Sequence, residues 1–109
     1  MKIWLDDLRS APDGWQWCQS VGDAKILIEF AERALLLDSD LSHMADPIEV
    51  ISLDHDMGDQ AFDGGDGIRL MDWLLERGSL YPLEFHTANP VGRENMERMY
   101  RRYWLHESL

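Results

Sequence analysis

The chain has little cysteine, few basic residues and no long apolar run, and each shortage excludes a class of protein. Its 109 residues include one cysteine, Cys18, so an internal disulfide is excluded and a reducing compartment is expected. Ten Lys and Arg residues stand against 21 Asp and Glu residues, and the net charge of −11 argues against bulk, non-specific binding to nucleic acid. No apolar run approaches the ~20 residues of a membrane span, and the first residues lack a signal-peptide pattern. We therefore expect a cytoplasmic protein with one domain covering residues 1–109.

Apolar residues make up 45% of the chain, and their spacing predicts alternating strands and helices. Strands are expected at residues 3–5, 15–20, 48–53 and 83–86. Helices are expected at residues 24–37, from residue 66 or 67 to residue 77, and from residue 90 onward. This order predicts an α/β fold of the flavodoxin-like type, with a small, mostly parallel sheet of about four strands and covering helices.

The ends and buried faces of these helices also have local signals. Asp23 predicts the N-cap of the first helix, Gly78 the end of the second, and Asn89 with Pro90 the start of the last. The expected buried face of the first helix comprises Leu27, Phe30, Ala31, Ala34 and Leu35. That of the second comprises Ile68, Met71, Trp73, Leu74 and Leu75, and that of the last comprises Met96, Met99, Tyr100 and Tyr103.

Acidic residues follow two of the expected strands. Asp6 and Asp7 come directly after the first strand, and Asp54 and Asp56 come after the third. The loops that follow parallel strands meet at one edge of the sheet, where such folds place their ligands. Crowded carboxylates repel, so a cation or shared protons usually stabilise them. Asp6, Asp7 and Asp54 are therefore candidate ligands of Mg²⁺ or Mn²⁺, and the alternative is that they are solvated loop residues that cap helices.

Two histidines adjoin strand ends at the same edge, His55 after the third strand and His86 at the end of the last. A histidine in such a place can move protons near neutral pH, so both are candidate catalytic groups, with Asp56 orienting an imidazole. The alternative is a hydrogen-bonded structural histidine. His43 and His106 lie in a connection and near the C-terminus, and we expect them at the surface.

The segment after the last expected strand has the composition of an anion site. A helix N-terminus presents free backbone N–H groups and a favourable dipole, and Gly92 would let a ligand come close. Arg93 can bind a phosphate through two hydrogen bonds, and Arg9 is a second candidate that can equally neutralise the acids. Thr87 and Asn89 belong to the same candidate phosphate site, although simple helix capping would also explain Asn89.

The five tryptophans are expected mostly in the core, because each buries a large area. Trp15 and Trp17 lie near a turn, and their alternative is to stack on a nucleobase. Arg98, Arg101 and Arg102 are expected to form a solvated face of the last helix.

This pattern resembles the receiver superfamily, which has an acidic pair after its first strand, an aspartate after a central strand and a threonine after a later one. In receivers the acids bind Mg²⁺ and the central aspartate, here Asp54, accepts a phosphoryl group. The chain departs from that pattern because it has no identifiable fifth strand with its lysine. It also adds His55, Asp56 and His86.

These departures make the chain similar to a narrower group, the cyclic-phosphate-processing receiver-like domains. The matching blocks are WLDDLR at residues 4–9 with Pro12, Gly14 and Trp15, SLDHDMG at residues 52–58, and HTANPVGRENM at residues 86–96. The resemblance implies metal-dependent processing of a cyclic phosphate, as a phosphodiesterase or hydrolase acting on a nucleotide or a 2′,3′-cyclic RNA end. The alternative is a signalling or interaction module that is phosphorylated at Asp54 or only binds a partner or nucleotide.

Overall fold

The structure is a computed structural model that describes residues 1–36 and 46–106. Within these residues, four strands form one sheet in the order β2-β1-β3-β4, and every neighbouring pair is parallel. The strands are β1 (Lys2–Leu5), β2 (Trp15–Cys18), β3 (Val50–Leu53) and β4 (Leu83–Phe85). The expected α/β fold with a small parallel sheet is thereby confirmed.

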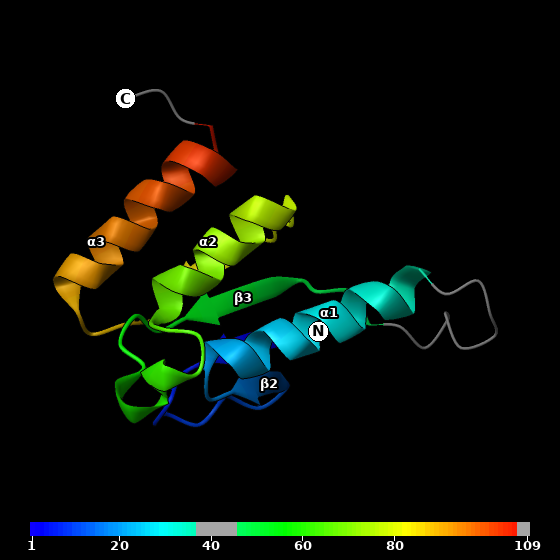
Figure 1. The fold of residues 1–109 in the computed structure, drawn as a ribbon, viewed down its shortest axis with the longest axis horizontal. Coiled ribbons are helices and arrows are strands. Elements are labelled where there is room, and N and C mark those ends of the chain that lie inside the picture. Colours follow the sequence, from blue (N-terminus) through cyan, green and yellow to red (C-terminus); the bar gives the residue numbers. More distant parts are fainter. Residues whose placement is uncertain (37–45, 107–109) are drawn as a thin grey trace.

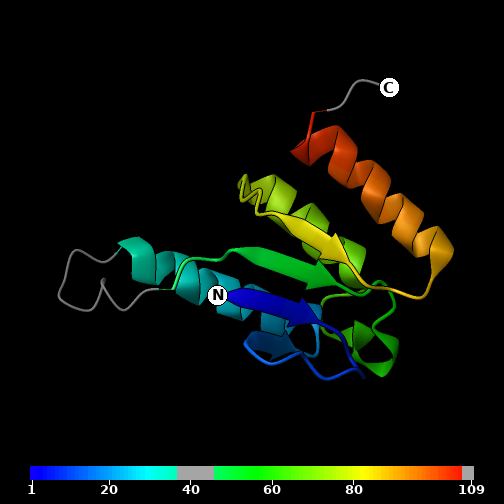
Figure 2. The same cartoon turned by 180° about the vertical axis from the view of Figure 1, so that it is seen from behind.

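The helices cover one face of this sheet. They are α1 (Val21–Leu36), α2 (Gly67–Arg77) and α3 (Pro90–Met99), with a 3₁₀ turn η2 (Gly58–Phe62) and a π-helical turn η3 (Tyr100–Trp104). Figure 1 shows α1 and α2 in front of the strands, and Figure 2 shows α3 beyond the β4 edge. Figure 2 shows the same sheet from behind, where no helix of the described residues lies in front of the strands.

The topology explains why both helices lie on the same face. The chain passes from β2 through α1 to β3, and from β3 through α2 to β4, so it moves in one direction across the sheet. Parallel crossovers are almost always right-handed, so two crossovers in one direction place their helices on one side. The connection from β1 to β2 contains no helix, and the other face is therefore left without one.

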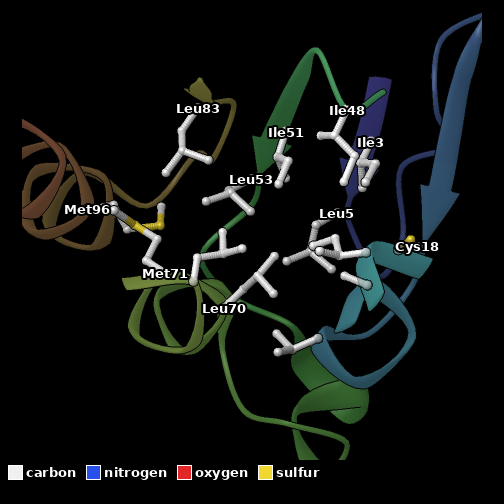
Figure 3. Close-up of a cluster of buried hydrophobic side chains, with 14 of the residues drawn as sticks. Ile3, Leu5, Cys18, Ile48, Ile51, Leu53, Leu70, Met71, Leu83 and Met96 are labelled. Atoms are coloured by element: carbon white, nitrogen blue, oxygen red, sulfur yellow. The ribbon is translucent and has the colours of Figure 1, made fainter. Parts of the chain in front are cut away.

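The hydrophobic core lies between the sheet and these helices. Fully buried strand residues are Ile3, Leu5, Ile51 and Leu53, and Figure 3 shows them facing α1 and α2. From the helices, the core receives Val21, Ala24, Ile28, Ala31, Leu70, Met71, Leu74 and Met96. Because successive side chains on a strand point to opposite faces of the sheet, every second strand residue points away from this core. The core thus anchors the strand ends from which the acidic loops emerge.

Aromatic side chains cover part of the helix-free face. The strand register pairs Lys2 with Trp15 and Trp4 with Trp17, so all three tryptophans point away from the core. Trp17 remains 41% exposed, while Trp104 is 8% exposed and belongs to the core. The prediction that the tryptophans lie mostly in the core is therefore wrong for those of β1 and β2. The alternation of side chains along a strand turns them to the face of the sheet that lacks helices.

The start of α1 differs from the sequence prediction. The helix begins at Val21, and the Ser20 Oγ accepts a hydrogen bond from the Asp23 N–H at 3.1 Å. Ser20 is therefore the capping residue, and the prediction of Asp23 was wrong. The other two boundary predictions are confirmed, because Gly78 adopts a left-handed φ of 72° and the Asn89 side chain accepts from the Gly92 N–H.

Two predicted buried faces are also corrected. In α1, Phe30 and Leu35 are 70% and 49% exposed, because the small Ala24 and Ala31 pack against the sheet and turn the larger side chains outward. In the last helix, Tyr103 is 42% exposed and Trp104 is buried instead. The π-helical turn places an extra residue in the turn, and this shifts the buried position by one.

Some remaining details concern the ends of the chain and the connections. The connection between β3 and α2 contains the 3₁₀ turn η2, and the observed strand boundaries lie within two residues of the predicted ones. His106 is exposed as expected, whereas His43 lies outside the described residues. In the part of the chain that the structure describes, no helix has the length and apolar character needed to cross a membrane.

Candidate active site

The carboxyl ends of β1, β3 and β4 surround one cavity of about 320 Å³. Asp6 and Asp7 follow β1, Asp54 follows β3, and Thr87 follows β4. The residues that line the cavity are Asp6, Asp7, Leu8, Arg9, Asp54, Asp56, Gly58, Thr87, Ala88 and Asn89. Segments far apart in the sequence therefore meet at the edge where open α/β sheets place their ligands.

Asp6 is almost fully enclosed by hydrogen-bond donors. Its Oδ1 accepts from the N–H groups of Leu8 and Arg9 at 2.9 and 2.8 Å. Its Oδ2 contacts the Arg9 Nε at 3.0 Å and the His86 Nε2 at 3.1 Å. Burial raises the pKa of the Asp6 carboxyl, but these hydrogen bonds and the Arg9 charge hold it below its ordinary value. An ionised carboxylate can accept about four hydrogen bonds, and Asp6 already accepts that number from protein donors. Its position is therefore fixed.

Asp7 and Asp54 lie beside it and complete a cluster of carboxylates. One oxygen from each of Asp6, Asp7 and Asp54 lies within 4.8 Å of the others. Burial raises the pKa of Asp7, and the neighbouring carboxylates raise it further because like charges repel. Such a group of carboxylate oxygens fits a hard divalent cation such as Mg²⁺ or Mn²⁺. Asp7 and Asp54 would be the better direct ligands of such a cation, because the Asp6 oxygens already accept hydrogen bonds from protein donors.

Two glycines make room for this cluster. Gly58 has a left-handed φ of +52°, and a Cβ there would lie 2.7 Å from the Asp7 Oδ2. Gly67 opens α2, and a Cβ there would overlap the Asp54 carbonyl oxygen. Neither glycine has a role that the local sequence pattern predicts. Gly58 therefore lets the backbone approach the Asp7 carboxylate, and Gly67 lets α2 approach the main chain of Asp54.

Arg9 is the cation of the cavity. Besides the Asp6 contact, its Nη2 donates to the His86 carbonyl oxygen at 2.9 Å, while about half of the side chain stays exposed. Arg9 thereby neutralises Asp6 and links the ends of β1 and β4. The remaining guanidinium N–H groups can still donate hydrogen bonds to a phosphate.

Asp56 is held from two sides. The His55 Nδ1 lies 2.8 Å from its Oδ1, and the Asn89 Nδ2 lies 3.1 Å from both carboxylate oxygens. These contacts, His55 first, lower the pKa of Asp56. Asp56 is 62% exposed and lines the cavity, whereas His55 is 17% exposed and does not. The two side chains are thus hydrogen-bonded, as an acid that orients an imidazole requires, and the catalytic roles expected of His55 and Asp56 stay predictions.

The start of α3 does not present Gly92 as a free N–H donor for an anion. The Gly92 N–H donates to the Asn89 Oδ1 at 3.0 Å, which is the capping arrangement. A Cβ on Gly92 would overlap the His55 ring, so this glycine accommodates a histidine. Arg93 pairs with Glu97 at 2.8 Å. Neither Gly92 nor Arg93 lines the cavity, in contrast to Thr87, which is 6% exposed and does.

His86 lies next to the cavity without lining it. Its Nδ1 lies 2.8 Å from the Ser52 Oγ, and its Nε2 contacts Asp6. Its ring stacks on Trp4 at 3.7 Å between centroids. Burial lowers the pKa of His86 more than the attraction of Asp6 raises it. Sequence reasoning missed Ser52 and Trp4, although Ser52 is the polar interruption in an apolar strand and pairs with Trp4 in register.

The parallel sheet order and the carboxylate cluster at its carboxyl edge define a receiver-like α/β domain. The family model for the cyclic-phosphate processing Receiver domain matches residues 1–102, and the chain belongs to this family. No curated protein and no solved structure gave a significant match. Family membership links the chain to cyclic-phosphate processing and to a phosphate-bearing substrate.

Proposed function

We propose that this protein is a metal-dependent phosphoesterase that opens a cyclic phosphate on a nucleotide or on the 2′,3′-cyclic end of an RNA. The observation that carries the proposal is the cluster of Asp6, Asp7 and Asp54, whose oxygens lie within 4.8 Å of one another in the cavity. Membership of the cyclic-phosphate processing family supports the class of substrate.

The charges around the cavity explain why a cation would be needed. Asp6, Asp7, Asp54 and Asp56 line it together with the cation Arg9. An anionic phosphate diester would be repelled by such a surface, so binding requires added positive charge. A divalent ion held by Asp7 and Asp54 would supply that charge and would make a bound water more acidic.

The chain's own groups can assist the reaction at stated atoms. Ring opening forms a P–O bond to water and breaks one ester P–O bond, and the departing oxygen takes up a proton. The guanidinium of Arg9, whose side chain is about half exposed, would stabilise charge on the phosphate oxygens. The Asp56 carboxylate is held in the cavity by His55 and Asn89, and we propose that it accepts the proton of the attacking water.

The test is turnover of a nucleoside 2′,3′-cyclic monophosphate followed by chromatography, with Mn²⁺ or Mg²⁺ and with EDTA. We expect a product that requires the divalent ion. Asp54→Asn should lose at least about 100-fold in rate, because loss of a direct ligand should cost no less than loss of a residue that only supports a ligand. Asp72→Asn is the matched control, because Asp72 is a partly exposed acid on α2 outside the cavity. Full activity of Asp54→Asn, or no product under any condition, would contradict the proposal.

A receiver-like signalling role is the second candidate, because Asp54 follows the central strand and faces the cavity. Incubation with a small phosphodonor and Mg²⁺, followed by intact mass, separates the two functions. A stable phosphoryl adduct that disappears in Asp54→Ala would favour the signalling role. Tight nucleotide binding without product would instead indicate a binding module.

A further inference from the structure

The His86 ring is enclosed on several sides. The Ser52 Oγ lies 2.8 Å from its Nδ1, and the Asp6 Oδ2 lies 3.1 Å from its Nε2. The indole of Trp4 covers one ring face, with 3.7 Å between centroids and 4° between planes. The side chain is 14% exposed and does not line the cavity. A general acid or base must bring a nitrogen within about 2.6–3.2 Å of the reacting group, and both nitrogens here have protein partners.

The partners also assign the proton on the ring. An ionised carboxylate only accepts hydrogen bonds, so the Nε2 of a neutral His86 carries the proton and donates to Asp6. The Nδ1 then accepts from the hydroxyl of Ser52. Ser52 is 1% exposed, so its hydroxyl would lack a partner in a buried place without the imidazole.

This chain of hydrogen bonds crosses the sheet. β3 lies between β1 and β4, so His86 at the end of β4 reaches over β3 to contact Asp6 at the end of β1. Trp4 of β1 pairs in register with Ser52 of β3, which places the indole under the ring. The Arg9 Nη2 adds a second link, because it donates to the His86 carbonyl oxygen at 2.9 Å.

We infer that His86 is a positioning residue that fixes the Asp6 carboxylate, with Ser52 and Trp4 holding its ring, and that it does not transfer protons to or from the substrate. The inference rests on the proposed function, because it assigns a role within the same site. Asp6 shares the cluster with Asp7 and Asp54, so an Asp6 carboxylate that turns would disturb the place where the cation binds.

The test compares His86→Gln with His86→Leu. A glutamine keeps an N–H donor that can reach Asp6 but cannot relay protons, whereas a leucine has neither property. We expect His86→Leu to weaken Mn²⁺ affinity in calorimetry by about 10–100-fold, as loss of a partner of a metal-site residue typically does. His86→Gln should restore most of that affinity and most of the kcat on a nucleoside 2′,3′-cyclic monophosphate.

The opposite pattern identifies a general base. Equal loss of kcat in both variants, with unchanged Mn²⁺ affinity, would overturn the inference. The control is His106→Gln, which changes an exposed histidine that does not line the cavity and should leave affinity and kcat unaltered. Melting curves of all variants identify any that fail to fold.

Ser52 supplies a second, independent comparison. Ser52→Ala should lower Mn²⁺ affinity in the wild-type background and have little further effect in His86→Leu, because both changes break one chain of hydrogen bonds. Full additivity of the two changes would contradict that chain. Long-range ¹H–¹⁵N spectra of the imidazole should show the Nε2–H form, and an Nδ1–H form would also overturn the inference.

These readouts separate the inference from the proposed function. A wild-type protein without turnover, but with Mn²⁺ affinity that depends on His86 as described, would contradict the phosphoesterase alone. Turnover together with the general-base pattern would contradict the positioning role alone. Absence of Mn²⁺ binding in every variant would contradict both.

Discussion

At the scale of single residues, neighbours decide how a buried ionisable group behaves. Asp6 is 1% exposed, yet its pKa lies below the ordinary value because donors surround both oxygens. Cys18 is 5% exposed, and burial together with the negative charge of Asp23 raises the pKa of its thiol to about 11. Burial favours the neutral form of both groups, and at Asp6 the surrounding hydrogen-bond donors and the Arg9 charge outweigh it.

The Cys18 thiol should react slowly in the folded protein. The thiolate is the nucleophile, and a pKa of about 11 instead of 9.0 reduces its fraction at pH 8 by roughly 100-fold. We expect slow alkylation by iodoacetamide at pH 8 in the folded protein and fast alkylation in urea. The free energy of unfolding should also fall as the pH rises from 9 toward 11, because the unfolded state loses the thiol proton first. Mass spectrometry of timed samples measures the rate, and equal rates in the two solvents would contradict the burial argument.

At the scale of elements, short polar contacts at helix ends determine where a helix begins. Ser20 caps α1, and its hydroxyl also donates to the Asp63 Oδ2 at 2.6 Å, which links α1 to the residues after η2. Asp23 lies in the first turn of the helix, where a negative charge interacts favourably with the helix dipole. These two contributions differ in size, so they can be separated by mutation.

Ser20→Ala should destabilise the protein by about 1–2 kcal/mol, because it removes the N-cap and the contact with Asp63. Asp23→Ala should cost less than about 1 kcal/mol, because only the dipole interaction is lost. Urea unfolding of both variants measures the difference. A larger effect of Asp23→Ala would show that the cap is misassigned.

Glycine substitutions test the close approach of α2 to Asp54. Gly67→Ala should cost about 2–3 kcal/mol through overpacking, because the new Cβ overlaps the Asp54 carbonyl oxygen. Gly78→Ala should cost about 1 kcal/mol, since nothing lies within 4 Å and the penalty comes from its φ of +72°. Denaturation curves check the order, and Gly78→Ala being the more damaging would contradict the steric argument.

At the scale of the whole molecule, acidic residues outnumber basic ones, and the helices cover the two faces of the sheet unequally. The chain carries a net charge of −11, and carboxylates line the cavity at the carboxyl edge of the sheet. Parallel sheets usually have both faces covered, but the described helices cover one face here. On the other face, Trp4 and Trp15 pack edge to face and Trp4 stacks on His86, so side chains supply part of the missing cover.

Divalent cations should stabilise the whole fold through the carboxylate cluster. Mn²⁺ at 100 times its dissociation constant should add about 2.7 kcal/mol to the free energy of unfolding, because it binds the folded state. We expect Tm to rise with Mn²⁺ in the wild type and to stay nearly constant in Asp54→Asn. NaCl at equal ionic strength is the control for screening, and an equal rise with NaCl would exclude a specific site.

Much of the fold followed from local signals in the sequence. Asn89 with Pro90, and Gly78, act through the backbone of neighbouring residues, so their roles could be predicted without knowing the tertiary structure. The start of α1 was missed because Ser20 and Asp23 are both acceptable caps, and the choice depends on the contact between Ser20 and the distant Asp63. The buried face of α1 likewise depends on which side chains fit the sheet.

The sequence by itself determined the order of the elements and placed acidic residues after β1 and β3, because strand periodicity and turn chemistry are local. Only the tertiary structure decided that His86 turns toward Asp6, which precedes it by 80 residues, and that Ser52 of β3 lies against the other nitrogen of its ring. The physical reason is that the direction of a side chain depends on which partners folding brings near it. Those partners come from strands that are distant along the chain.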